Sequence, residues 1–133
     1  MRLIDLLVLE HVLEHFVDPV SEMNRILKKV KPNKYLIVEI PNLIDIANSD
    51  RNPITYFQNA HTFCFYQQYL EIFFHKLGLD VLYADETCSF VLRRPASWRE
   101  VQPKLKIESP ELEACVPTVE SYLKYAHVKW NAK

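Results

Sequence analysis

Two histidines and a glutamate lie close together near the N-terminus, in the segment His11-Val12-Leu13-Glu14-His15. Such side chains can bind a divalent metal or move a proton, because an imidazole titrates near neutral pH. The H-x-x-E-H spacing binds zinc in some peptidases, where a helix turns both histidines toward one ion. A peptidase would also need an acidic ligand from a matching downstream helix, and this interpretation leaves the patterns that follow unexplained. We therefore predict no metal site and keep a zinc peptidase as a second alternative function.

Polar side chains also follow the apolar segments of the sequence. Glu10 and His11 come directly after the apolar run 3–9, and Asn42 follows the strand-like segment 35–40. In an open α/β sheet, ligands bind beyond the carboxyl ends of the strands. These side chains are therefore candidates for contact with a ligand.

A further candidate, His61, lies at the end of residues 43–60, which have no strong hydrophobic period and are interpreted as a long loop. Loops of this length are often functional. An imidazole is a common proton-transfer group, because its ordinary pKa lies near neutral pH. Cys64 lies three residues beyond His61, but no second ligand pair accompanies them, so we predict no metal there either.

The elements that must position these residues alternate along the chain. Asp18-Pro19 predicts a helix start, with Asp18 as the N-cap and Pro19 in the first turn. Gly78 fits the position just after a second helix. The predicted helices have apolar stripes over 20–30 and 66–77, a turn is predicted at 31–34, and the predicted strands are 3–9, 35–40, 79–84 and 89–94. This order predicts a three-layer α/β fold in which the last two strands form a hairpin.

Composition restricts the class of protein. The 133 residues suit one domain, and a net charge of −1 gives no electrostatic reason to bind nucleic acid or an anionic membrane. No apolar run approaches the about 18 residues of a membrane helix, and no signal peptide is recognisable. Three widely spaced cysteines indicate reduced thiols. We therefore expect a cytoplasmic protein with a compact domain at 1–95. The proline-punctuated segment 96–133 is predicted to be a helical tail that packs on this domain or on a partner.

Two segments carry longer motifs in a fixed order. The first holds Leu9-Glu10-His11, Asp18-Pro19, Leu27-Lys28-Lys29-Val30-Lys31-Pro32 and Pro41-Asn42. The second holds His61-Thr62-Phe63-Cys64-Phe65 and Lys76-Leu77-Gly78-Leu79-Asp80-Val81. They resemble the stretch from the fourth to the fifth strand, and the segment before the sixth, of class I S-adenosylmethionine (SAM)-dependent methyltransferases. The small-molecule and sugar branch of that family is the most similar, although Asn59 replaces a histidine and Asn33-Lys34 replaces two glycines.

The resemblance implies a Rossmann-like half-domain with strand order 4-5-7-6, flanking helices and a helical C-terminal tail. It implies SAM as the methyl donor, with Glu10 and His11 contacting the cofactor. It also suggests Asn42 and His15 on the acceptor side and His61 as the catalytic base. Gly78 is the single glycine of the chain, so no GxGxG loop that would hold most of SAM is present.

The resemblance also implies that the strand at 3–9 is an open sheet edge, which a second polypeptide would pair. The expected partners are a small-molecule acceptor and either a second copy of the chain or a separate N-terminal half. The leading hypothesis is a methyltransferase that is truncated, and weak or inactive alone. The alternative is a non-catalytic half-domain that pairs through its open edge.

Overall fold

The structure is a computed structural model that describes residues 3–44, 63–102 and Lys124. The elements follow the order β1 (Ile4–Glu10), η1 (Leu13–His15), α1 (Pro19–Leu27), β2 (Val30–Glu39), α3 (Gln67–Lys76), β3 (Asp80–Ala84) and β4 (Ser89–Arg94). His61, most of the expected loop and most of the expected tail lie outside the described residues. None of the described helices combines the length and the apolar character that a membrane span requires.

The four described strands form one sheet in the order β1-β2-β4-β3. β1 and β2 are parallel, whereas β4 runs antiparallel to both of its neighbours, β2 and β3. The predicted hairpin of the last two strands is confirmed, and β4 lies between β2 and β3. This arrangement confirms the expected partial Rossmann-like sheet, in which β1, β2, β4 and β3 correspond to strands 4, 5, 7 and 6.

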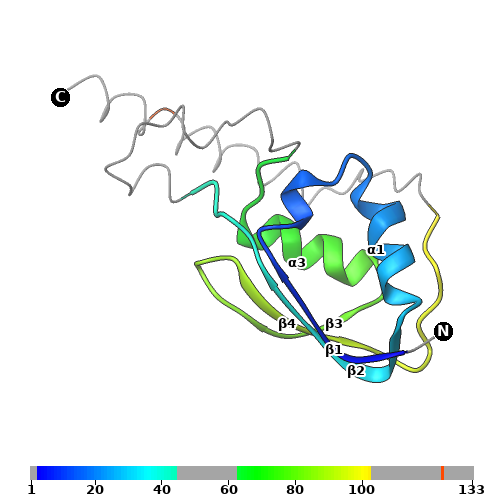
Figure 1. Ribbon diagram of the computed structural model, residues 1–133. Helices are drawn as coiled ribbons and strands as arrows, with labels where there is room; N and C mark the ends of the chain where they lie inside the picture. The colour runs from blue at the N-terminus through cyan, green and yellow to red at the C-terminus, as the bar shows by residue number, and fades with distance from the viewer. Residues whose placement is uncertain (1–2, 45–62, 103–123, 125–133) are drawn as a thin grey trace.

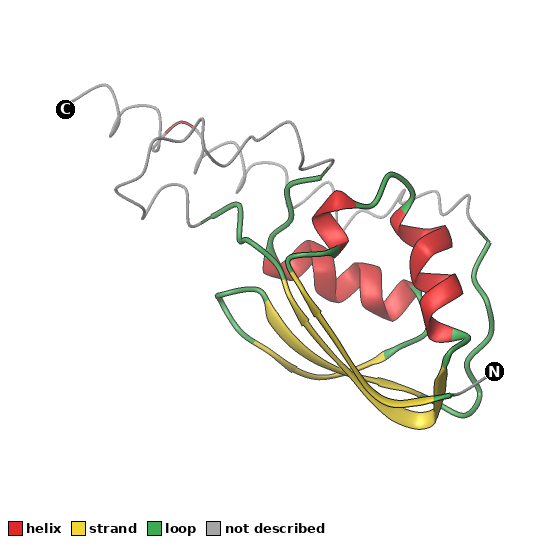
Figure 2. Cartoon of the chain, viewed as in Figure 1, coloured by secondary structure: helices red, strands yellow, loops and turns green. Residues whose placement is uncertain are grey.

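Helices α1 and α3 lie on the same face of the sheet (Figures 1 and 2). The described residues therefore form two layers, where the sequence predicted three. The core lies between α1, α3 and this face; its fully buried side chains include Leu13, Met23, Leu27, Leu36, Leu70, Phe74, Phe90 and Leu92. Phe74 of α3 packs edge-on against Phe90 of β4, with ring centroids 5.1 Å apart.

The opposite face of the sheet carries apolar side chains that no described residue buries. The register aligns Val8, Ile37, Val91 and Tyr83 in one row across the four strands, and Leu6 pairs with Tyr35 in the next row. Val8 is 55% exposed and Leu6 is 53% exposed. The outer edge of β1 is also unpaired among the described strands. The apolar run at 3–9 is therefore a parallel strand, as predicted, but only one of its faces is covered.

The predicted turn at 31–34 is part of β2 instead. Ile4 pairs with Val30 and Leu6 with Tyr35, so β2 takes up three extra residues as an irregularity in the ladder. Asn33 adopts the left-handed conformation there, with φ 58°. The ammonium groups of Lys31 and Lys34 lie 2.7 and 3.3 Å from the Asp5 carboxylate. Asn33 therefore has turn-like backbone geometry, but the pairing of β2 with β1 and β4 keeps the segment within the sheet.

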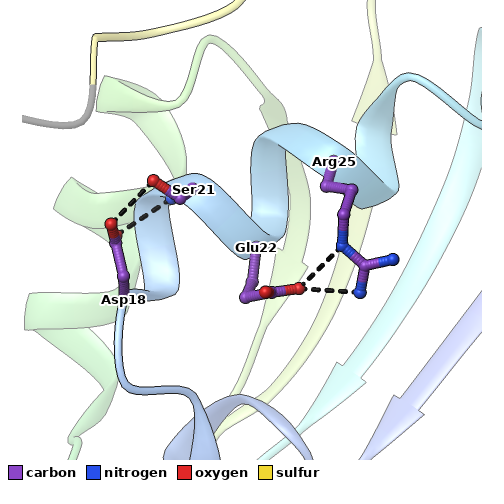
Figure 3. A network of polar contacts seen from close by, with 4 residues as sticks. All are labelled: Asp18, Ser21, Glu22 and Arg25. Carbon is purple, nitrogen blue, oxygen red and sulfur yellow. Dashed lines mark hydrogen bonds and ion pairs between the residues drawn. The ribbon is translucent and has the colours of Figure 1, made fainter.

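Helix α1 begins as the sequence predicts. The Asp18 carboxylate accepts hydrogen bonds from the backbone N–H and the hydroxyl of Ser21, at 3.0 and 2.6 Å (Figure 3). These hydrogen bonds lower the pKa of Asp18, with the hydroxyl contributing most. Farther along, the Arg25 guanidinium donates twice to Glu22. The helix ends at Leu27, three residues before the predicted end, because Val30 already belongs to β2.

Helix α3 ends at a left-handed glycine, as predicted. Gly78 has φ +74°, and its N–H donates to the carbonyl of His75. The indole of Trp98 covers this turn and is buried. Val101 also packs against the core, and its backbone exchanges two hydrogen bonds with the Asn24 amide on α1. Packing therefore continues beyond residue 95, whereas the division of the chain at that residue stays a prediction.

Candidate functional site

Three ligand-type side chains meet where β1 and β2 end. Glu10 and Glu39 are paired as the last residues of these parallel strands. The chain turns sharply at His11, whose φ is 52° and whose N–H donates to the Glu39 carbonyl at 2.9 Å. Glu10, His11 and Glu39 each have one potential metal-ligand atom, and these three atoms lie within 4.8 Å of one another. All three residues are exposed. The predicted cofactor residues Glu10 and His11 therefore lie at the carboxyl edge of the sheet.

Glu14 lies directly behind this edge, in the short helix η1. Its side chain is buried, with the whole residue 1% exposed, and neither carboxylate oxygen has a hydrogen-bond partner in the described structure. Its Oε1 lies 3.5 Å from Nδ1 of His11 and 3.8 Å from Nε2 of His15. The carboxylate would pair with either imidazole when that ring is protonated.

The H-x-x-E-H segment does not form the helix that a zinc peptidase requires. The only helical residues in it are Leu13–His15, which form a single 3₁₀ turn, and His11 has left-handed backbone geometry. The two histidines approach the same Glu14 oxygen, 3.5 and 3.8 Å away. The segment therefore lacks the helix that a zinc peptidase site requires, and the zinc peptidase alternative is wrong.

Asn42 follows β2, and its side chain forms hydrogen bonds with backbone groups of neighbouring segments. Its amide donates to the carbonyl of Glu86 at 2.5 Å, and its Oδ1 accepts from the N–H of Ile44 at 3.0 Å. Asn42 also forms a parallel bridge with Phe65, and its residue is 5% exposed. These contacts join the end of β2 to the β3–β4 hairpin. The predicted contact between Asn42 and a substrate stays a prediction.

The segment that follows His61 returns to the same edge. Phe63 donates its N–H to the carbonyl of Glu14, and Phe65 accepts from Leu43. The ring of Phe65 stacks with those of Phe63 and Tyr69, and burial raises the pKa of the Tyr69 hydroxyl. The described residues just after His61 therefore lie beside η1 and the end of β2.

Two features of this edge were not singled out from the sequence. Glu39 had been assigned only to a strand, although it ends β2 as Glu10 ends β1. The rule that places ligands beyond parallel strand ends could have identified it. No comparable pattern in the sequence could have predicted that Glu14 is buried, because its burial depends on the packing of η1 against the core.

The sheet order and the strand directions are those of a partial Rossmann-like α/β domain. Residues 2–84, more than half of the chain, match a family model described as a methyltransferase domain. The chain therefore belongs to this methyltransferase family, and its fold is part of a class I SAM-dependent methyltransferase-like domain. Comparisons with curated proteins and with solved structures found no match.

Proposed function

We propose that this chain serves SAM-dependent methyl transfer to a small-molecule or sugar acceptor. One observation carries the proposal: Glu10 and His11 lie at the carboxyl end of β1, beside its parallel neighbour β2, in a sheet of this family's strand order. Ligands of open α/β folds bind at such an edge. Members of this family generally use SAM as the methyl donor.

The proposed roles follow from the resemblance to the family. Glu10 and His11 contact the methionine or adenosine part of SAM, while His15 and Asn42 lie on the acceptor side. His61 removes the proton of the acceptor as the methyl group leaves the sulfonium, which requires the acceptor atom to be held in line. The described neighbours of His61, Phe63 and Phe65, lie beside η1 and support this assignment.

We also propose that these residues alone bind SAM weakly. Their single glycine leaves no GxGxG loop to approach the cofactor closely. Isothermal titration calorimetry of the full chain with SAM should give no saturable heat at SAM concentrations below about 1 mM. A Kd of about 1 mM corresponds to a binding free energy of about −4 kcal/mol. Micromolar binding would contradict the claim of weakness and would support cofactor binding by Glu10 and His11. A Glu10→Gln, His11→Gln double variant tests whether any observed binding uses this edge.

A second candidate function is a non-catalytic pairing module. The β1 edge, which no described strand pairs, and the exposed Leu6, Val8 and Ile37 favour it, because an apolar edge strand can pair with another chain. The partner would be a second copy or a separate N-terminal half of the domain. Sedimentation equilibrium should reveal a concentration-dependent dimer that Val8→Lys weakens. A monomer at all concentrations would contradict pairing with a second copy. Co-purification of the chain with a separately expressed segment that contains a GxGxG loop would support pairing with a separate N-terminal half.

A further inference from the structure

We propose that Glu10, His11 and Glu39 bind a divalent metal ion, with the buried Glu14 orienting the His11 imidazole. The inference goes beyond methyl transfer, because it concerns ion binding at the β1–β2 edge and holds whether or not SAM binds. It differs from the expectation from the sequence, which was that no metal site is present.

The backbone brings the three ligands together. The parallel register places Glu10 beside Glu39, and the turn at His11 is held by its hydrogen bond to the Glu39 carbonyl. The donor atoms lie within 4.8 Å of one another on exposed side chains. Rotation of these side chains can bring them to the roughly 2.0–2.2 Å metal–ligand distances that nitrogen and carboxylate donors adopt. Three protein ligands would leave the ion open positions for water or a ligand.

Glu14 supplies a second and independent observation. A buried carboxylate without hydrogen bonds is unfavourable, and native structures rarely leave one without a reason. Its Oε1 lies 3.5 Å from Nδ1 of His11. A histidine that ligates a metal usually donates its other ring N–H to a carboxylate or carbonyl group. If Nε2 of His11 binds the ion, the N–H at Nδ1 points toward Glu14. The Glu14 carboxylate then gains the hydrogen-bond donor that it lacks.

The donor set indicates the class of ion. Two carboxylates and one imidazole combine oxygen and nitrogen donors without a thiolate, which suits Mn²⁺ or Zn²⁺ better than a thiophilic ion such as Cu⁺. Because all three ligands are exposed, the ion would exchange with solvent rather than be trapped. Mn²⁺ is the practical choice for detection, since its unpaired electrons report on both binding and ligand identity.

The test is a titration of the full chain with Mn²⁺, followed by electron paramagnetic resonance of the free ion. We expect one saturable site per chain, and Glu39→Gln should weaken it at least tenfold. Glu14→Gln, which removes no ligand, should weaken binding by about 10- to 100-fold, as is typical of groups that orient a ligand. Glu100→Gln is the matched control, because that exposed carboxylate pairs with Lys28, and it should leave the affinity unchanged.

Ligand identity gives a separate readout. Spin-echo spectra of the Mn²⁺ complex should show coupling to an imidazole nitrogen that disappears in His11→Gln. Binding that does not saturate, or equal affinity in the wild type and Glu39→Gln, would overturn the site. Wild-type affinity in Glu14→Gln would overturn the orienting role. Circular dichroism of each variant shows whether it is folded, and Glu39→Asp gives a second ligand variant if Glu39→Gln unfolds.

Discussion

The indole N–H of Trp98 donates a buried hydrogen bond to the backbone carbonyl of Leu77, at 2.9 Å. Leu77 is the C-cap residue of α3, and its carbonyl has no partner within the helix at this end. The Arg94 guanidinium lies 4.8 Å from the centre of the same indole ring. Trp98, which follows β4, therefore completes the end of α3 and joins it to β4.

Replacing Trp98 should separate the hydrogen bond from the packing. Trp98→Phe keeps an aromatic ring but leaves the Leu77 carbonyl without its donor, so we expect a loss of about 1–2 kcal/mol in the free energy of unfolding. Trp98→Ala also opens a cavity and should cost about 3–5 kcal/mol. Urea denaturation followed by circular dichroism at 222 nm measures both. Equal losses for the two variants would show that packing contributes nothing beyond the hydrogen bond.

Gly78→Ala should destabilise the fold through the backbone alone. A Cβ at this position would meet Trp98 Cδ1 at 3.5 Å, which is ordinary contact, whereas φ +74° is unfavourable for alanine. We expect a loss of about 1–2 kcal/mol. Gly78→Asn is the matched control, because asparagine adopts left-handed geometry more readily and should lose less. A larger loss for asparagine in thermal denaturation would indicate that space, and not φ, limits this position.

The Asp18 cap should make stability depend on pH. Hydrogen bonds from Ser21 lower the pKa of Asp18 in the folded state, so its ionised form stabilises the helix. This contribution is present above the unfolded pKa and disappears as the pH falls through the folded pKa. Asp18→Asn can still accept a hydrogen bond but carries no charge. The gap in Tm between wild type and Asp18→Asn should therefore be widest near neutral pH and close in acid; a constant gap would contradict the linkage.

The uncovered face of the sheet should tolerate polar substitution if nothing covers it in solution. Val8→Thr, on that face, should change the free energy of unfolding by less than about 0.5 kcal/mol. Leu36→Ala, on the covered face, should cost about 2–5 kcal/mol, because Leu36 is fully buried. A loss above about 1.5 kcal/mol for Val8→Thr would instead show that a partner or another part of the chain buries this face.

Asn42→Ala should reduce stability as well as any activity. It removes the donor to the Glu86 carbonyl and the acceptor for the Ile44 N–H, so we expect a loss of about 1–3 kcal/mol. Chemical denaturation gives this loss, and a SAM-dependent methyl-transfer assay with the whole domain gives the effect on KM and kcat. A raised KM for the acceptor with unchanged stability would favour direct substrate contact over the structural role.

Local patterns in the sequence predicted most of the elements. The Asp18-Pro19 start, the Gly78 stop and the apolar periods identified α1, α3 and the hairpin within a few residues. The strand order came from the resemblance to a family and not from periodicity, which carries no information on which strands are neighbours. The end of α1 and the turn at 31–34 were misjudged, because pairing with β1 draws Val30 and the residues after it into β2.

The sequence by itself determined the identity of the local elements, because caps, turns and hydrophobic periods act between residues a few positions apart. It also identified Glu10 and His11 as strand-end candidates. Only the tertiary structure placed Glu39 beside them, buried Glu14 behind them and showed that the described residues leave one face of the sheet uncovered. These features depend on contacts between segments that are distant in the sequence: pairing of β1 with β2 brings Glu39 beside Glu10, and packing of η1 against the core buries Glu14.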